Sequence, residues 1–403
     1  MRHGEFVSCS GEYVDEVLAV FMPSGKSYTG LDQIEIFCHG GRRVVQVVLE
    51  QALVAGARPA EPGEFTKLAF LNGRIDLAKA EAVAEVIAAS TEASLRAGRD
   101  HLTGHYSEYV SRLRSDLLAA LADLEASIDF SEDDVAQIDT VVFANRLQVI
   151  HNAIQQLAAT YLGGRIVREG FRVAICGRPN AGKSSLFNRL LEHERALVDP
   201  EPGTTRDYLS EWIDLGGFAV NLVDTAGLRD AGGRVEKQGQ AKAQQIIERA
   251  ELILWVVDMS EPNWFEQAGA DLKAFSEQTN LIIGNKLDLV VDGCSELSTE
   301  VLAVSCVTHD GIQEVQSAIL ALINDMMPDL TSGQVVTSAR HKRCLDLAAD
   351  GISRTVSALE SGESAEVLAF ELRQAGDQLG EITGQVYTEE ILGEIFSRFC
   401  IGK

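Results

Sequence analysis

The spacing of the hydrophobic positions changes along this chain. It predicts a small α+β unit, then long helices, then a sheet region, and then helices again. Residues 1–70 contain short apolar runs, at 18–22 and 33–38, that end in turn residues, as in a small α+β unit. Between residues 76 and 161 the apolar positions follow the spacing of a buried helix face, at 113, 117, 121, 124 and 128 and again at 143, 147, 150, 154 and 157. Residues 337–397 are again helical in pattern, and 389–399 predicts a last helix.

The region between these helices alternates short β-rich runs with helix-length segments. The predicted strands are Phe171–Cys176, Phe218–Val223, Leu252–Asp258, Leu281–Gly284 and Val301–Ser305. This alternation is typical of a parallel sheet with helices on both faces. Because helices precede and follow it, we expect an α/β domain inserted into one helical domain. The expected domains are residues 1–72, 73–167, 168–327 and 328–403, the second and fourth forming one discontinuous helical domain.

Composition excludes several classes of protein. Of the 403 residues, 46% are hydrophobic, and the formal net charge is −25, which argues against a protein that mainly coats nucleic acid. The longest clean apolar runs, among them Leu252–Val257, are far too short to span a membrane, and no secretory signal opens the chain. The seven cysteines are scattered without a CxxC pair, so we expect neither structural zinc nor a disulfide framework, and a cytoplasmic location.

The most specific motif follows the first predicted strand of the inserted domain. It reads Gly177-Arg178-Pro179-Asn180-Ala181-Gly182-Lys183-Ser184 and opens a helix through Leu186 and Leu190. This is the context of a phosphate-binding P-loop, in which backbone N–H groups and the helix N-terminus face the phosphates. Lys183 can then reach the β- and γ-phosphates, and the Ser184 hydroxyl can bind Mg²⁺.

Three further motifs follow in the order that a GTPase requires. Asp224-Thr225-Ala226-Gly227 ends a strand, and its aspartate can hold a magnesium-bound water. Asn285-Lys286-Leu287-Asp288 offers a carboxylate that can accept from both guanine donors, which adenine does not present. Ser305-Cys306-Val307 can supply a backbone N–H to the guanine carbonyl. The predicted GTP site comprises Asn180, Ala181, Gly182, Lys183, Ser184, Ser185, Thr204, Thr205, Asp224, Thr225, Ala226, Gly227, Asn285, Lys286, Asp288 and Ser305.

Two further positions bear on hydrolysis, and the second distinguishes this chain from a Ras-like GTPase. The segment Gly203–Asp207 contains a threonine, Thr205, suited to be the second Mg²⁺ ligand when the loop closes on the γ-phosphate. The residue after the Asp-Thr-Ala-Gly turn is Leu228, which cannot orient water as glutamine does. Five residues in the following stretch remain candidates for orienting the water, namely Arg229, Asp230, Arg234, Glu236 and Gln238.

The C-terminal Cys400-Ile401-Gly402-Lys403 allows two interpretations. The thiol near the chain end is placed for chemistry, or the end is frayed and the cysteine is incidental.

Several segments resemble the MnmE (TrmE) family of tRNA modification GTPases. They are the P-loop, Gly203–Asp207 and Asp224–Arg229, together with the more specific Pro62-Gly63-Glu64-Phe65, Ala69-Phe70-Leu71-Asn72, the run 76–82 and the terminal Cys-Ile-Gly-Lys. The resemblance covers all parts of the chain. It implies a multidomain α/β fold: a Ras-like P-loop GTPase domain inserted in a discontinuous helical domain, after a partial folate-binding-type α+β domain.

The resemblance also implies a function. Members work with an MnmG-type FAD protein to add an aminomethyl or carboxymethylaminomethyl group to C5 of the tRNA wobble uridine, using a tetrahydrofolate one-carbon unit. GTP hydrolysis would depend on Mg²⁺ and K⁺, in a homodimer without contact to membranes. The resemblance further implies that this chain begins downstream of the family's opening strand and a folate-contacting arginine, which predicts weak folate binding.

The resemblance assigns these roles to individual residues of this chain. Glu236 would orient water beside Lys183, and Cys400 would take part in the modification. Ser184 and Thr205 would bind Mg²⁺, whereas Asn180, Asp199, Glu201 and Thr204 would bind K⁺. Folate would contact Glu35, Arg74 and Lys403.

Two alternatives belong to other functional classes. A ribosome-assembly or other regulatory GTPase of the same superfamily would carry a basic or GxxG RNA-binding module, and residues 337–403 show neither. A scaffold gated by nucleotide without hydrolysis is disfavoured by the intact Lys183, Ser184, Thr205, Asp224 and Glu236.

Overall fold

The computed structural model describes residues 1–129, 139–193, 195–197, 209–225, 245–272, 278–290, 301–327 and 334–402. The chain divides into two compact units. The first comprises Met1–Ala84, His101–Ile154 and Cys344–Lys403, and the second comprises Glu85–Asp100 and Gln155–Arg343. None of the helices in the described ranges combines the length and the hydrophobicity that a membrane crossing requires. The acidic cluster at 132–134 lies outside these ranges.

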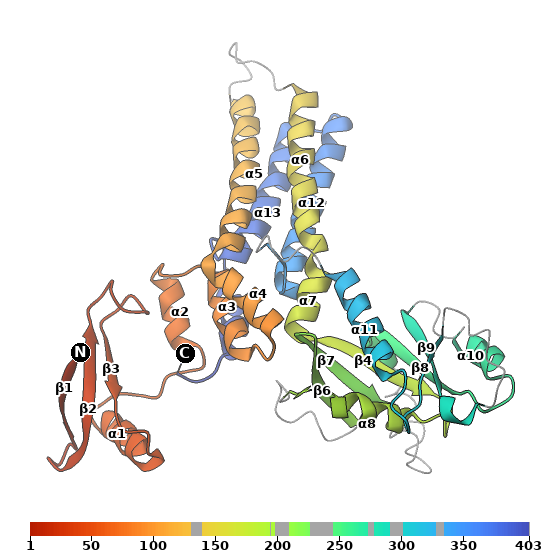
Figure 1. Cartoon of the computed structure of the whole chain (residues 1–403). Helices are drawn as coiled ribbons and strands as arrows, with labels where there is room; N and C mark the ends of the chain where they lie inside the picture. The colour runs from red at the N-terminus through yellow and green to blue at the C-terminus, as the bar shows by residue number, and fades with distance from the viewer. Residues whose placement is uncertain are drawn as a thin grey trace, which may run out of the picture. The chain divides into compact units, whose positions relative to one another are not determined.

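The first unit begins with the small α+β structure that the sequence predicts. Strands β1 (Arg2–Val7), β2 (Tyr13–Met22) and β3 (Gln33–Phe37) form an antiparallel sheet in that order, and helices α1 (Arg42–Val54) and α2 (Glu64–Leu71) follow. Strand β1 was not predicted. Five of its six residues are exposed, so it carries none of the hydrophobic alternation that marks a half-buried strand. Figure 1 shows β1 at one side of this three-stranded sheet, beside β2.

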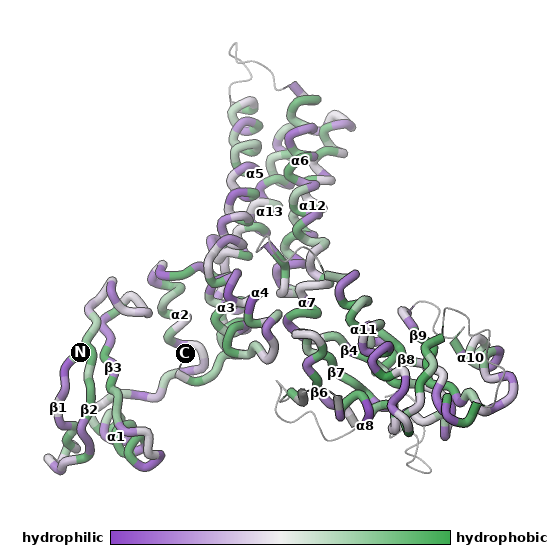
Figure 2. Tube along the Cα trace, viewed as in Figure 1, coloured by the Kyte–Doolittle hydropathy of each residue, from purple (hydrophilic) through white to green (hydrophobic). Residues whose placement is uncertain are grey.

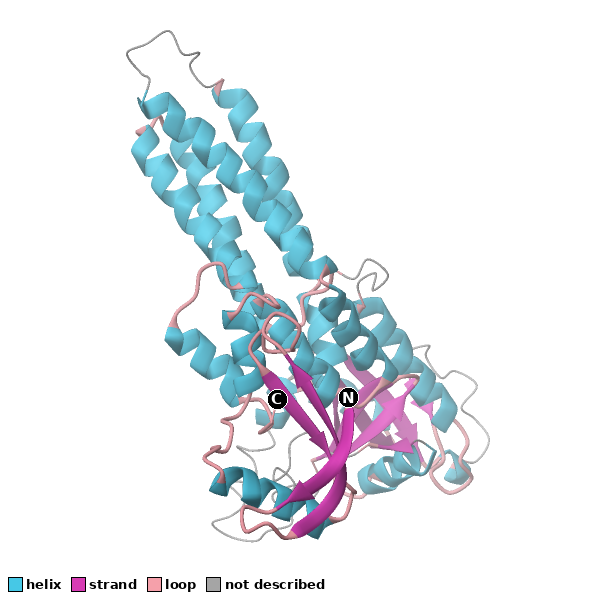
Figure 3. Cartoon of the chain, turned by 90° about the vertical axis from the view of Figure 1, so that its left-hand side faces the viewer, coloured by secondary structure: helices cyan, strands magenta, loops and turns pink. Residues whose placement is uncertain are grey.

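Four helices that lie wholly or mostly in the first unit run side by side as a bundle (Figure 3). They are α5 (His105–Asp129), α6 (Thr140–Ala159), α12 (Ala339–Glu360) and α13 (Ala365–Thr383). The predicted periodicity is confirmed, since Leu113, Leu117, Leu121 and Leu124 of α5 are all buried. Helix α13 approaches α5 closely, and Arg114 Nε donates to the Gly376 carbonyl at 3.0 Å.

The chain end is docked rather than frayed. Helix α14 (Glu389–Ser397) packs through Phe396 on α2 and on α3 (Leu77–Ala88). Gly63 adopts a left-handed φ of 65°, and a Cβ there would lie 3.0 Å from both the Phe396 carbonyl and the Phe399 side chain. The Gly63 N–H donates to the Cys400 carbonyl at 3.4 Å, and Pro62 forms a β-bridge with Ile401. The Pro-Gly-Glu-Phe turn therefore fixes the backbone beside the exposed Cys400 thiol.

The same turn contains a strongly shifted carboxylate. Arg58 pairs with both oxygens of Glu64, with Nη1 at 2.9 Å from Oε2, and the Glu61 N–H donates to Oε2 at 2.8 Å. These bonds, chiefly that to Arg58, lower the pKa of Glu64 to about 2. Because the pKa is depressed on folding, this carboxylate stabilises the turn above its ordinary pKa of 4.5 and ceases to do so as pH falls towards 2.

We therefore expect Arg58→Gln to raise the pKa of Glu64 towards its ordinary value. The carboxyl ¹³C shift followed by NMR between about pH 1.5 and 6 measures this, and Glu64→Gln assigns the resonance. An unchanged titration in Arg58→Gln would show that Arg58 is not the cause.

The second unit contains a seven-stranded sheet in the order β10-β9-β8-β4-β7-β6-β5. The five predicted strands are confirmed within two residues: β4 (Phe171–Gly177), β7 (Phe218–Asp224), β8 (Leu252–Asp258), β9 (Asn280–Asn285) and β10 (Val301–Ala303), all parallel. Strands β5 (Arg195–Ala196) and β6 (Leu209–Leu215) add an antiparallel edge that the sequence did not predict. Strand β6 lies between β7 and the two-residue edge strand β5, and polar residues interrupt it although Ile213 and Leu215 are buried.

Helices cover both faces of this sheet, as predicted. Val173 and Ile175 of β4 pack with α8 (Lys183–His193) and α11 (Ile312–Met326). The alternate residues Ala174 and Cys176 pack on the other face, with α10 (Trp264–Leu272). The two-sided burial explains why β4 and β8 are hydrophobic along most of their length (Figure 2). Helices α4 (Glu92–Thr103) and α7 (Tyr161–Glu169) and the 3₁₀ turn Leu287–Leu289 complete the described elements.

Candidate nucleotide-binding site

The predicted motifs converge at one edge of the second unit's sheet. Gly177 closes β4, Asp224 closes β7, Asn285 closes β9, and Ser305 follows β10. Since these strands are parallel, their carboxyl ends lie at the same edge, where open α/β sheets bind ligands. The fold therefore gathers motifs that lie more than a hundred residues apart in sequence.

The P-loop takes its shape from two glycines whose side-chain positions are occupied. A Cβ on Gly177 (φ 141°) would lie 2.2 Å from the Val256 carbonyl, and one on Gly182 (φ 94°) would lie 2.0 Å from the Asn285 amide nitrogen. Helix α8 starts directly at Lys183, so its N-terminus faces the loop. Lys183 is buried, and its Nζ donates to the Arg178 carbonyl at 2.8 Å. This loop is built to bind an anion.

Ser184 and Asp224 offer hard oxygen ligands side by side. The Ser184 hydroxyl on α8 donates to Asp224 Oδ2 at 2.7 Å, and Asp224 is fully buried at the end of β7. Next to it, Thr225 Oγ1 donates to the Ile175 carbonyl at 2.9 Å and fixes the turn. A hydroxyl and a carboxylate beside a phosphate loop fit Mg²⁺, which prefers oxygen ligands and leaves its remaining positions to water and phosphate.

The loops after β9 and β10 are bonded to each other and to the P-loop. Asn285 Nδ2 donates to the Ala181 carbonyl at 2.9 Å, which ties the end of β9 to the P-loop. The Ser305 hydroxyl donates to Asp288 Oδ1 at 2.6 Å. Lys286 has a left-handed φ of 66° and forms an ion pair with Asp258 at the end of β8. This arrangement places one aspartate carboxylate beside a short turn of backbone N–H groups, which could together bind a ring that carries donors and a carbonyl.

The other predicted residues are placed as follows. Asn180 is exposed at the tip of the P-loop with a left-handed φ of 63°, and Ser185 is exposed in the first turn of α8. Glu35 lies on β3, where Gln33 Nε2 donates to its Oε1 at 3.0 Å. Arg74 follows α2, and its side chain passes the backbone of Gly30. Eight predicted residues lie outside the described ranges: Asp199, Glu201, Thr204, Thr205, Ala226, Gly227, Glu236 and Lys403.

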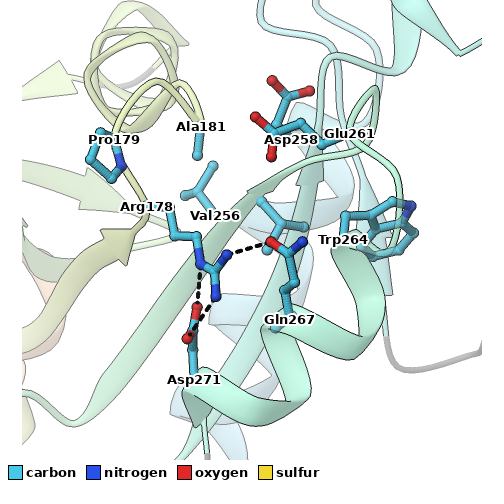
Figure 4. Close-up of a pocket in the computed structure, with 11 residues that line it drawn as sticks. Arg178, Pro179, Ala181, Val256, Asp258, Glu261, Trp264, Gln267 and Asp271 are labelled. Carbon is cyan, nitrogen blue, oxygen red and sulfur yellow. Dashed lines mark hydrogen bonds and ion pairs between the residues drawn. The ribbon is translucent and has the colours of Figure 1, made fainter.

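One feature beside the site was not predicted from sequence. A pocket lies between the P-loop, the end of β8 and α10, and Arg178 crosses it (Figure 4). Arg178 Nε and Nη2 donate to the two oxygens of Asp271 at 2.9 and 3.1 Å, and Nη1 bonds Gln267. The bidentate pair links the first turn of the P-loop to α10. No local signal could reveal a pair separated by 93 residues.

The chain matches two family models. The model of the MnmE helical domain matches residues 77–400, and that of the GTP-binding protein TrmE N-terminus matches residues 1–74. The structure is also similar to the G domain of the FeoB iron transporter of T. maritima, at 26% identity over 38% of this chain and 97% of that chain, with a TM-score of 0.29.

Curated relatives match over almost the full chain. The tRNA modification GTPase MnmE of Moorella thermoacetica is 42% identical over 404 residues, which cover 98% of this chain and 87% of that protein. Those of Akkermansia muciniphila and Aquifex aeolicus are 41% and 39% identical, and each match covers 98% of this chain and 87% or 88% of the relative. This chain therefore belongs to the MnmE family of tRNA modification GTPases.

Proposed function

We propose that this protein hydrolyses GTP and uses the cycle to modify the wobble uridine of tRNA at C5, together with an MnmG-type FAD protein. One observation carries the nucleotide part: Lys183, Ser184 with Asp224, and Asp288 with Ser305 lie at one sheet edge in hydrogen-bonded contact with the surrounding loops. Membership in a family of tRNA modification GTPases supports the tRNA part.

The described residues suit phosphoryl transfer to water. Backbone N–H groups of the P-loop and the N-terminus of α8 would bind the phosphates, and Lys183 would neutralise charge on the β- and γ-oxygens. Ser184 and Thr205 would hold Mg²⁺, which when bound stabilises the charge that develops on the transferred group. Asp224 would accept from a water of that ion, and its bond to Ser184 supports this role.

The proposed water-orienting residue is Glu236. Leu228 cannot hydrogen-bond water, so the residue that follows the Asp-Thr-Ala-Gly turn is excluded from this role. K⁺, held by Asn180 together with Asp199, Glu201 and Thr204, would supply positive charge where an arginine finger acts in other GTPases. The exposed, left-handed Asn180 at the tip of the P-loop is consistent with a ligand of such an ion.

The modification chemistry would involve the first unit and the chain end. We propose that Glu35, Arg74 and Lys403 contact a tetrahydrofolate derivative and that Cys400 takes part in the transfer. The docked backbone beside the exposed Cys400 thiol supports a defined place for this group. We further propose that the protein works in the cytoplasm as a homodimer.

Reconstitution tests this function. The full chain, an MnmG-type FAD protein, GTP, a methylene-tetrahydrofolate and unmodified tRNA should yield a C5-modified uridine, detected by mass spectrometry of digested nucleosides. We expect GTP turnover to be about tenfold faster in KCl than in NaCl at equal ionic strength, or about 1.4 kcal/mol of transition-state stabilisation. Asn180→Ala is the matched control and should remove the difference between the salts.

Each part can fail separately. Equal turnover of the native protein in the two salts would contradict the K⁺ site. Intact GTP turnover without any modified uridine would contradict the tRNA function.

A further inference from the structure

The loop that follows β10 is held from two sides at a single residue. The Cys306 carbonyl accepts from Arg189 Nε on α8 at 2.7 Å. The Cys306 N–H makes a longer bond of 3.4 Å, to Asn285 Oδ1. The carbonyl bond is the shorter of the two, so Arg189 sets the position of this residue more firmly than Asn285 does.

Hydrogen bonds within this loop fix its shape, but they do not fix its position relative to the P-loop. The Ser305 hydroxyl accepts from the N–H groups of Val307 and Thr308 at 3.3 and 3.1 Å and donates to Asp288. These bonds make residues 305–308 a closed turn next to the guanine-binding carboxylate. Arg189 extends from the helix that begins at the P-loop lysine, so its bond relates the turn to the phosphate-binding elements.

The surroundings of Arg189 favour this bond. Its Nη1 pairs with Glu192 one turn further along α8, which restricts the side chain and leaves Nε directed at the carbonyl. Cys306 is buried, and burial raises the pKa of its thiol to about 11, so the thiol is neutral at neutral pH. The guanidinium is therefore bound through the carbonyl and not by a thiolate. A buried carbonyl that loses its donor is costly, so the loop would shift if Arg189 were removed.

We propose that Arg189 is a positioning residue for guanine recognition: it holds Cys306 so that the backbone N–H of this turn meets the 6-carbonyl of the base. The inference rests on the proposed GTP site. The long bond from the Cys306 N–H to Asn285 is one that the base carbonyl can replace. In this role Arg189 contacts neither the base nor the phosphates. It acts through the carbonyl of Cys306, the residue whose N–H would meet the base.

A matched pair of variants separates the hydrogen bond from packing. Arg189→Gln places an N–H donor the same number of bonds from Cα as Nε, whereas Arg189→Met keeps the aliphatic length without a donor. Glu192→Gln removes the ion pair alone. Affinities are measured by displacement of a fluorescent GDP analogue with GDP, inosine diphosphate and 2-aminopurine riboside diphosphate. The first two carry the 6-carbonyl, and the third lacks it.

We expect Arg189→Met to weaken GDP and inosine diphosphate about five- to tenfold and to leave the 2-aminopurine nucleotide within about twofold of the native value. Arg189→Gln should bind all three nucleotides as the native protein does. Glu192→Gln should do so as well, because its amide oxygen can still accept from Arg189 Nη1 and keep the side chain in place. The kcat for GTP should not change in Arg189→Met at saturating GTP, because the loss is uniform in ground and transition state.

Two results would overturn the proposal. An equal loss for all three nucleotides would show that Arg189 only supports the domain, and unchanged affinities in Arg189→Met would show that it has no role. If the guanine site itself were misplaced, the native protein would not prefer GDP to the 2-aminopurine nucleotide, so that failure is distinguishable.

Discussion

Asp288→Asn is expected to lower the affinity for GTP by about two orders of magnitude and to raise the affinity for xanthosine triphosphate. The native carboxylate can accept from both guanine donors, and the Ser305 hydroxyl holds one of its oxygens at 2.6 Å. An amide cannot accept from both donors, and two charge-assisted bonds lost or reversed cost about 3 kcal/mol, or about 150-fold. Xanthine replaces the 2-amino donor by a carbonyl, which an asparagine N–H can meet.

Equilibrium binding of GTP and xanthosine triphosphate to both proteins measures this exchange. Ser305→Ala is the matched control, because it removes the hydroxyl that orients the carboxylate but keeps the carboxylate itself. We expect a smaller loss of GTP affinity there and no gain for xanthosine triphosphate. Native-like GTP binding by Asp288→Asn would show that Asp288 does not read the base.

Ser184→Ala is expected to lower GTP turnover about a hundredfold or more at physiological Mg²⁺. The hydroxyl lies 2.7 Å from the buried Asp224 carboxylate, between the start of α8 and the end of β7. Its removal takes away the described side-chain oxygen that would ligate Mg²⁺ directly. The loss of charge stabilisation in the transition state is then about 3 kcal/mol, as for removal of one transition-state donor.

Turnover as a function of Mg²⁺ concentration checks the reason as well as the size of the effect. The Mg²⁺ concentration for half-maximal rate should rise in Ser184→Ala, and Ser184→Thr, which keeps the hydroxyl, should restore both rate and Mg²⁺ dependence. A slow Ser184→Ala enzyme with a native Mg²⁺ dependence would assign the serine another role.

The local sequence pattern was sufficient to predict the helices and strands that are buried on one or both sides. The largely apolar run at 171–176 and the helical spacing from Leu113 to Leu124 both became the elements that they predict, because burial selects those patterns directly. The exposed β1 was missed for the same reason, since five of its six residues are exposed. Strand β6 was missed although Ile213 and Leu215 are buried, because polar residues stand between its apolar positions.

The placement of the predicted nucleotide motifs was likewise readable from sequence. Gly177 and Gly182 occupy positions where any Cβ would collide with Val256 or Asn285, so the glycine spacing records the loop conformation itself. Lys183, Asp224 and Asp288 follow strands whose parallel order brings them to one edge. In such a motif the residue type at a position already indicates the backbone conformation there.

Three features were decided only by the tertiary structure. The Gly63 contact with Cys400 docks the chain end, the Arg178–Asp271 pair joins the P-loop to α10, and Arg189 holds the Cys306 carbonyl. The partners in each case lie far apart in the chain, with the closest pair 93 residues apart. The sequence around a side chain or a carbonyl does not indicate which distant group it will contact. The sequence by itself determined the elements and the nucleotide motifs, because these depend on nearby residues. The contacts that orient the motifs depend on how the chain packs, and only the folded structure decides them.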